Sequence, residues 1–190
     1  MTLMVTLHGG CFVGGSHLWD QKQTFCLQKL GYQVHQLDFP KDNFEDTIDF
    51  IHKTLLQLVK SNEGNKLHLL GRSSGGYLAK VLFDKYPDLI KKAIYLAPVF
   101  DPITRGKINT KFQTKQSHYF RNTVELPNTE SFNSTREFLF LAERDANVPK
   151  ECFTTEQLKL AIHLGIQTHG GLLQTTSNAF QQKIMEIMKS

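Results

Sequence analysis

The stretch LLGRSSGGYLAK, residues Leu69–Lys80, sets two serines among three glycines, between an apolar run and a helical pattern. Glycines allow the backbone to turn sharply there, because residues without a side chain tolerate conformations that others avoid. A strand, a tight turn of the form Gly-x-Ser-x-Gly and a helix together form the context of a nucleophile elbow. This stretch therefore bears both on the fold of the chain and on whether it carries a nucleophile.

Short β-rich runs alternate with helical patterns along the chain. The predicted strands are Leu3–Leu7, Tyr32–Leu37, Lys66–Leu70, Ala93–Leu96, Phe138–Ala142 and a weaker one at Ile166–Thr168. Further helices are predicted from about Ser16 to Leu30, from near Asn43 to Val59, from about Cys152 to Leu164 and from about Ser177 to Lys189. This alternation predicts an α/β protein, a three-layer sandwich with a mostly parallel sheet of about six strands.

Two glycine-rich turns follow strands of this predicted sheet, at residues 8–10 and 71–76. If the chain winds outward from the first strand in both directions, the two turns become neighbours at the edge where such sheets bind ligands. Ser73 has a glycine two residues away on either side, whereas Ser74 would need Arg72 to be small. Ser73 is therefore the candidate nucleophile. The alternative interpretation is an ordinary Gly/Ser loop that caps a helix.

The sequence HGG at residues 8–10, together with GRSSG at residues 71–75, resembles the α/β-hydrolase superfamily of serine esterases, lipases and thioesterases. The resemblance covers nearly the whole chain in element order. It implies a single domain over residues 1–190, a reduced member that lacks the usual leading hairpin, and no cofactor or metal. It also implies an oxyanion hole formed by the N–H groups of Gly10 and Ser74, with Gly9 nearby.

A phosphate cradle is the alternative interpretation of the first loop. The spacing of Gly10 and Gly15 is right for such a loop, but Ser16 follows where a lysine is needed, and the chain has no Gly-x-Gly-x-x-Gly motif. The oxyanion interpretation is therefore preferred. Within this interpretation, Cys11 stands where some small esterases have a further glycine.

The superfamily places its catalytic acid and base after the serine in the order Ser, Asp or Glu, His. Asp145 follows the fifth predicted strand and is itself followed closely by Val-Pro, which resembles the family's acid loop. Asp101, just after the fourth predicted strand, is the reserve candidate. A surface turn is the plain alternative for Asp145, because aspartate is common in turns.

His169 is the candidate base, because it follows the sixth predicted strand and precedes two glycines. His163 falls in a predicted helix and His118 in a basic insert, so neither stands at a strand end. His8 is expected to anchor its own loop by hydrogen bonds. In the resulting mechanism His169 deprotonates Ser73, which attacks an acyl carbonyl, and activity should fall as His169 becomes protonated.

A lid-like insert is expected at about residues 100–135, because the connection there is much longer than usual. The segment 101–122 carries five basic residues, Arg105, Lys107, Lys111, Lys115 and Arg121, against a single acid, and the rest of the chain is balanced. Aromatic residues beside positive charge would suit an acyl group on an acidic carrier. A small-molecule ester is the preferred substrate, a carrier-linked thioester the second, and a non-catalytic binding module on this scaffold remains the other class.

Composition excludes several other classes of protein. The net charge is only +4, and outside one segment the charges balance, so nucleic-acid binding is not expected. No apolar run approaches the roughly 18 residues of a membrane helix. The three cysteines are too scattered for a disulfide framework or a zinc site. With no signal-peptide pattern, the sequence predicts a cytoplasmic protein.

Overall fold

The computed structural model describes residues 2–10, 21–40, 42–113, 118–121, 123 and 125–189. Within them, six parallel strands form one sheet in the order β2-β1-β3-β4-β5-β6. The strands are β1 (Thr2–Leu7), β2 (Tyr32–Leu37), β3 (Leu67–Arg72), β4 (Ile90–Leu96), β5 (Glu137–Leu141) and β6 (Ile162–His163). The chain passes from β1 to β2 on one side and continues from β3 on the other. The predicted α/β fold is confirmed, and the winding reverses between β1 and β3.

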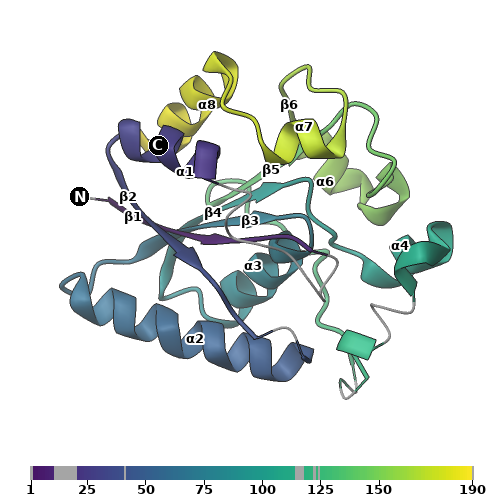
Figure 1. The fold of residues 1–190 in the computed structure, drawn as a ribbon, viewed down its shortest axis with the longest axis horizontal. Coiled ribbons are helices and arrows are strands. Elements are labelled where there is room, and N and C mark those ends of the chain that lie inside the picture. The colour runs from purple at the N-terminus through teal and green to yellow at the C-terminus, as the bar shows by residue number, and fades with distance from the viewer. Residues whose placement is uncertain are drawn as a thin grey trace.

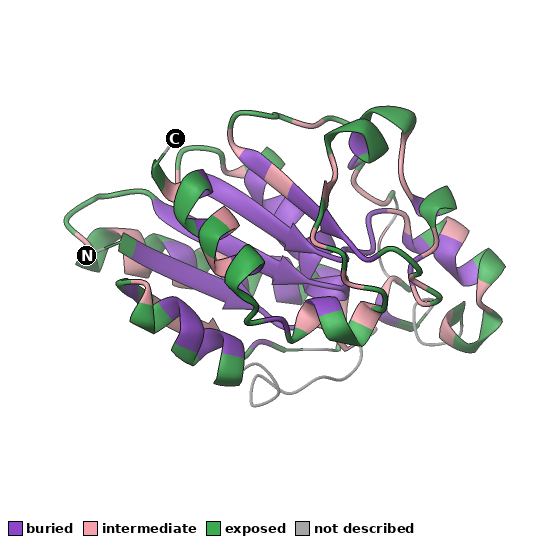
Figure 2. Ribbon diagram, turned by 90° about the horizontal axis from the view of Figure 1, so that it is seen from above, coloured by how far each residue is buried: buried purple, intermediate pink, exposed green. Residues whose placement is uncertain are grey.

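Helices cover both faces of the sheet (Figure 1). On one face lie α2 (Phe44–Ser61) and α3 (Ser74–Lys85), and on the other lie α1 (Gln21–Lys29) and α8 (Asn178–Lys189). The four inner strands, β1, β3, β4 and β5, are buried along most of their length (Figure 2), as expected of a parallel sheet that is covered on both faces, whereas the edge strands β2 and β6 are partly exposed. The predicted three layers are therefore present.

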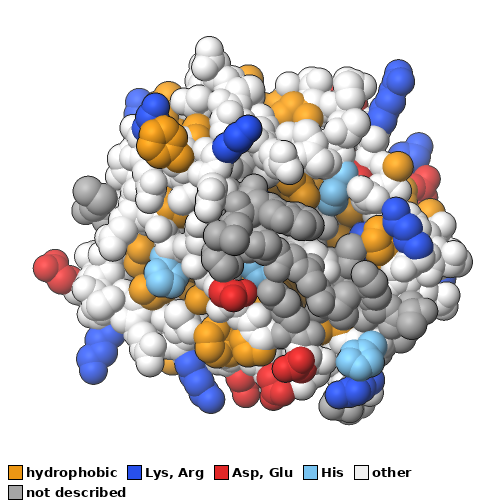
Figure 3. Space-filling view, in the orientation of Figure 1, with side chains coloured by type: hydrophobic (Ala, Val, Ile, Leu, Met, Phe, Trp, Pro, Cys, Tyr) orange, Lys and Arg blue, Asp and Glu red, His pale blue; other side chains and the backbone are white. Residues whose placement is uncertain are grey.

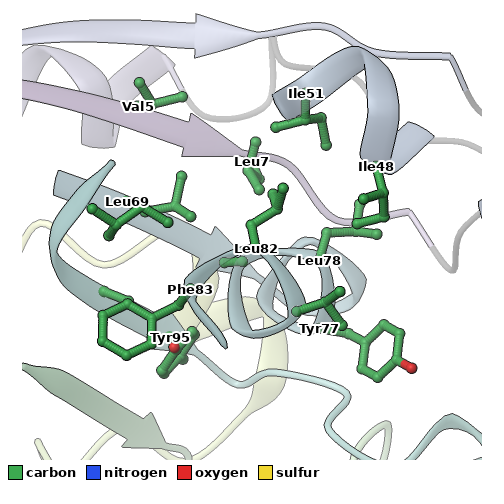
Figure 4. Packing of buried hydrophobic residues seen from close by; sticks show 14 of the residues in the cluster. Val5, Leu7, Ile48, Ile51, Leu69, Tyr77, Leu78, Leu82, Phe83 and Tyr95 are labelled. Atoms are coloured by element: carbon green, nitrogen blue, oxygen red, sulfur yellow. The ribbon is translucent and has the colours of Figure 1, made fainter. Parts of the chain in front are cut away.

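Helix α2 illustrates how the sequence builds one of these layers. Asn43 caps the helix by accepting a hydrogen bond from the N–H of Asp46 at 2.9 Å. Ile48 and Ile51, on the apolar stripe of α2, pack toward Leu78 of α3 and the strands beneath (Figure 4). The helix that the sequence predicted from this stripe is confirmed.

Two elements near the C-terminal end differ from the sequence prediction. The sixth strand is not at residues 166–168 but at Ile162–His163, where it pairs with Phe140 and Leu141. The helix predicted over residues 152–164 is a 3₁₀ turn, Lys150–Cys152, followed by the short helix α6 (Thr155–Leu160). Residues 16–20 of the first predicted helix lie outside the described part of the chain.

The insert between β4 and β5 contains α4 (Pro102–Ile108) and a 3₁₀ turn, Thr110–Phe112. Its aromatic residues do not gather around one hollow. Tyr119 is 1% exposed and packs against Phe44 of α2, and Phe120 packs against Tyr77 of α3. This part of the insert therefore belongs to the core on the α2–α3 side.

Among the residues that the structure describes, none of the helices is long and apolar enough to cross a membrane.

Candidate active site

Ser73 stands between β3 and α3 in a backbone conformation that side-chain-bearing residues rarely adopt, with φ 51° and ψ −119°. Three backbone hydrogen bonds hold it there. Its N–H donates to the carbonyl oxygen of Leu96, and its own carbonyl oxygen accepts from the N–H groups of Gly76 and Val99. A strained residue persists only where the surroundings fix it in this way, and such residues cluster at active sites.

The glycines of the turn are required by close backbone approach. A Cβ on Gly71 would lie 2.5 Å from the carbonyl oxygen of Gly75, and a Cβ on Gly75 would lie 2.5 Å from that of Leu7. Real Cβ atoms do not approach other atoms so closely, so neither position accepts a side chain while the turn keeps its shape. The sequence pattern that singled out Ser73 thus has a steric cause in β1, β3 and α3.

The structure brings the three candidate catalytic side chains together. The His169 Nε2 atom lies 3.1 Å from Ser73 Oγ, and its Nδ1 atom lies 2.7 Å from Asp145 Oδ2. With Nδ1–H donating to the carboxylate, Nε2 can accept the serine proton. The side chains of His169 and Asp145 are 11% and 8% exposed, so solvent screens their contact little.

The second carboxylate oxygen of Asp145 is held by its own loop. Its Oδ1 atom accepts hydrogen bonds from the N–H groups of Asn147 and Val148, each at 2.9 Å. These bonds fix the carboxylate plane and leave Oδ2 for the imidazole. Asp145 does lie in a turn, as its alternative interpretation expected, and that turn orients the carboxylate toward His169.

His169 does not sit in a loop after a strand, as the sequence suggested. It is the first residue of the short helix α7 (His169–Leu173), whose N-cap is Thr168. The Thr168 hydroxyl accepts a hydrogen bond from the N–H of Gly171 at 3.2 Å. The helical pattern was overlooked because α7 is only five residues long and includes two glycines.

The other candidates have different roles in the structure. The Asp101 carboxylate caps α4 by accepting from the N–H of Thr104, so the reserve acid is used as a helix cap. His163 lies 3.6 Å from Glu143 at the surface. His118 is exposed and lies close to Arg121 in the insert. Among the described residues, none of these three side chains forms a hydrogen bond or an ion pair with Ser73 or His169.

The predicted oxyanion residues flank the serine. A Cβ on Gly9 would lie 3.0 Å from the Ser73 Cβ and 3.7 Å from its Oγ, so the Gly9 backbone lies directly beside the nucleophile. Gly10 follows with φ 137°, and Ser74 begins α3, where N–H groups have no partner within the helix. Cys11–Ser16, the rest of this loop, lie outside the described residues.

His8, which precedes these glycines, is held by ring stacking and by polar contacts. Its ring stacks on Phe39 with the two centroids 4.4 Å apart, and its Nε2 atom lies 3.7 Å from Asp38. Its Nδ1 atom lies 2.7 Å from the carbonyl oxygen of Gly9. The side chain thus fixes the start of the loop, through stacking as well as through the polar contacts that were expected.

Thiol and metal chemistry find little support in the described residues. Burial raises the pKa of the Cys152 thiol to about 12, which keeps it protonated, and the pKa of Cys26 is raised by burial as well. Within the described ranges, no group of three or more His, Cys, Asp or Glu side chains could hold a metal ion. Ser73 therefore remains the candidate nucleophile of this site.

Comparison with known proteins identifies the family of this chain. A family model named Esterase, described as "Putative esterase", matches residues 3–180. The chain belongs to this family. It is also similar to a curated Arabidopsis thaliana protein named "Probable lysophospholipase BODYGUARD 4", at 23% identity over 107 residues, or 52% of this chain and 25% of the relative. The chain thus spans about a quarter of the length of the curated relative that it matches.

This Esterase member shares its fold with two solved structures of esterases. An esterase from the fungus Rhizomucor miehei has a TM-score of 0.73 at 17% identity, covering 99% of this chain and 73% of the fungal one. The methylesterase MES16 from Arabidopsis has a TM-score of 0.69 at 13% identity, with each chain covered in full. At such identities the likeness shows the fold, and the α/β-hydrolase resemblance read from the sequence is confirmed.

Sequence reasoning missed the burial of Arg105, a cation beside the site. Arg105 was counted among the surface charges of the insert, but it is 1% exposed, and its Nε atom donates to the carbonyl oxygen of Asn147 in the acid loop. A helical arginine among lysines gives no sign of burial.

Proposed function

We propose that this Esterase member is a serine hydrolase that cleaves a carboxylic ester, with Ser73 as nucleophile, His169 as general base and Asp145 as the orienting acid. The observation that carries the proposal is the continuous contact from Ser73 Oγ through the imidazole to the Asp145 carboxylate, at 3.1 and 2.7 Å. A serine hydroxyl becomes a useful nucleophile when a base takes its proton and a third group orients that base.

The reaction proceeds in two halves. The Ser73 oxygen bonds to the ester carbonyl carbon while its proton passes to His169 Nε2, and the carbonyl electrons move onto oxygen. The N–H groups of Gly10 and Ser74 stabilise this oxyanion, with Gly9 beside them. When the oxyanion collapses, the bond to the alcohol breaks and His169 returns the proton to it. Water then attacks the acyl-serine through the same base and releases the carboxylic acid.

A neutral ester is favoured over a thioester on an acidic carrier. The basic segment is weaker as a docking surface than its sequence suggested, because Arg105 is buried and Asp101 caps α4. On the face drawn in Figure 3, lysine and arginine side chains lie apart from one another around the margin. A neutral ester should show kcat/KM nearly independent of ionic strength, whereas a carrier-linked substrate should lose rate steeply as salt rises.

A fluorophosphonate probe tests the nucleophile directly. The wild-type chain should be labelled at Ser73 and should hydrolyse short p-nitrophenyl esters, and Ser73→Ala should lose both properties. Ser61→Ala is the matched control, because Ser61 is an exposed serine near the end of α2 whose hydroxyl only caps a local carbonyl. If neither the wild type nor the variant is labelled, the chain is a binding module on this scaffold and the proposal fails.

A further inference from the structure

We propose that Arg105 is a positioning residue for the acid of the site, acting through a single peptide group. This inference rests on the proposed function, in which Asp145 orients His169. The Arg105 Nε atom donates to the carbonyl oxygen of Asn147 at 2.8 Å. The N–H of Val148 belongs to the same peptide group as that carbonyl, and it donates to Asp145 Oδ1 at 2.9 Å. One peptide thus stands between a guanidinium and the carboxylate.

This arrangement has an electrical consequence. A cation hydrogen-bonded to a carbonyl oxygen withdraws electrons from the peptide, so the N–H of that peptide becomes a stronger donor. The Val148 N–H therefore holds the negative Asp145 more firmly than an ordinary amide would. Arg105 and Val148 are 1% and 3% exposed, so water competes little with either bond.

Arg105 is itself fixed from several sides. Its guanidinium carbon lies 3.7 Å from the centroid of the Phe112 ring, a cation–π contact within the insert. Its backbone N–H donates to the carbonyl oxygen of Asp101, whose side chain caps α4 at Thr104. The insert thus holds the Arg105 guanidinium in place, and the guanidinium supports the loop after β5 that carries Asp145. An arginine suits this place because it stays charged when buried.

The chain of contacts runs from the insert to the nucleophile. It passes from Arg105 through the peptide of residues 147–148 to Asp145, then to His169 and to Ser73 Oγ. Any change in the insert that moves α4 would loosen the contacts of Asp145 and His169 without touching the substrate. Arg105 therefore influences the rate of the chemical step through Asp145, and not the binding of the ester.

Arg105→Gln tests the inference, with Lys107→Gln as the matched control. Both variants remove one cation from α4, but Lys107 is exposed. Arg105→Gln should lower kcat about 10-fold, the effect of losing one charge-assisted hydrogen bond behind a reacting group, and leave KM nearly unchanged. Lys107→Gln should alter neither. Arg105→Lys, which keeps the charge and can still donate to the Asn147 carbonyl, should recover part of kcat.

A second readout does not depend on activity. The proton between His169 Nδ1 and Asp145 gives a low-field proton NMR signal, which His169→Gln identifies by its loss. Arg105→Gln should move or broaden this signal, and Lys107→Gln should leave it in place. Arg105→Lys serves for both readouts if Arg105→Gln does not fold, and it should then show an intermediate shift and rate.

The outcomes separate the two proposals. A moved signal together with a lowered kcat supports the positioning role. An unmoved signal, or a moved signal with wild-type kcat, overturns it. If the wild-type chain itself hydrolyses no ester and takes no fluorophosphonate, the proposed function fails, and the catalytic role of Arg105 fails with it, even where the NMR signal still responds to Arg105→Gln.

Discussion

Ser73 is one of three non-glycine residues with a positive φ in the described part of the chain, together with Glu63 and Ala97. Its positive φ lifts the hydroxyl off the end of β3 and aims it at the imidazole of His169, 3.1 Å away. The cost of that conformation is of the order of 1–3 kcal/mol, and the hydrogen bonds to Leu96, Gly76 and Val99 hold the residue in it. The conformation that is unfavourable for the residue itself is the one that brings its hydroxyl within hydrogen-bond distance of His169.

At the same scale, the burial of His68 makes stability depend on pH. This β3 histidine is 2% exposed, and burial, followed by the charges of Lys91 and Lys92, lowers its pKa to about 4. In the unfolded chain it titrates near its ordinary value of about 6.5. As the pH falls from about 6.5 toward 4, the unfolded chain therefore binds a proton that the folded chain excludes, and the free energy of unfolding decreases.

We therefore predict that His68→Leu weakens the dependence of stability on acid pH. The wild type should lose roughly 3 kcal/mol through this one group between pH 7 and pH 4, and the variant should not. Urea unfolding at both pH values measures the difference. Equal losses in the two proteins would mean that His68 takes up its proton in the folded state and that the imidazole is less isolated than its burial indicates.

At the scale of elements, the short helix α7 holds His169 where the sequence predicted a loop. Thr168 caps α7 through Gly171, and the first residue of the helix is His169. Thr154 caps α6 in a similar way, accepting from the N–H of Gln157 at 3.1 Å, but α6 carries none of the candidate catalytic residues. Each threonine accepts a hydrogen bond from the N–H three residues on, and at Thr154 the Gln157 side chain also accepts from the N–H of the cap, so the two caps can be compared on an element with a proposed role and on one without.

We predict that Thr168→Val and Thr154→Val each cost about 1 kcal/mol of stability, the usual value of an N-cap. Only Thr168→Val should lower kcat, by a few-fold, because fraying of α7 lets the imidazole leave its place between Asp145 and Ser73. Thermal melting and ester hydrolysis measured on the same samples give both numbers. Similar losses of kcat in both variants would show that the effect is one of general stability.

The elements also show where sequence reasoning reached its limit. The elbow could be predicted, because Gly71 and Gly75 leave a mark that sterics impose on any chain making this turn. The sixth strand was placed at residues 166–168, because a two-residue edge strand has no periodicity of its own. The burial of Arg105 could not be predicted either, since it depends on where the acid loop lies in space. The sequence therefore predicted the features that depend on local residue patterns, but not those that depend on contacts between distant segments.

At the scale of the whole molecule, a buried ionic cluster joins the elbow helix to the strand that leads to the acid loop. Lys80 of α3 lies 3.1 Å from Glu137 of β5 and 2.5 Å from Asp84, and both Lys80 and Glu137 are almost fully buried. Glu137 also accepts hydrogen bonds from the Tyr95 hydroxyl and from the N–H of Asn133, each at 2.6 Å. Burial, and then the charge of Glu137, raise the pKa of Tyr95, so its hydroxyl stays a donor.

The side chains of this cluster stabilise the molecule only together, because removing one charge leaves the opposite charge buried without a partner. We predict that Lys80→Met costs about 3–5 kcal/mol, since it leaves the Glu137 carboxylate buried without its cation. Adding Glu137→Gln should recover much of that loss, because the amide can still accept from Tyr95 and carries no charge. Urea unfolding of the wild type, both single variants and the double variant measures the coupling between the two positions. Losses that simply add in the double variant would contradict the prediction, because they would show two independent side chains in place of one ion pair shared by α3 and β5.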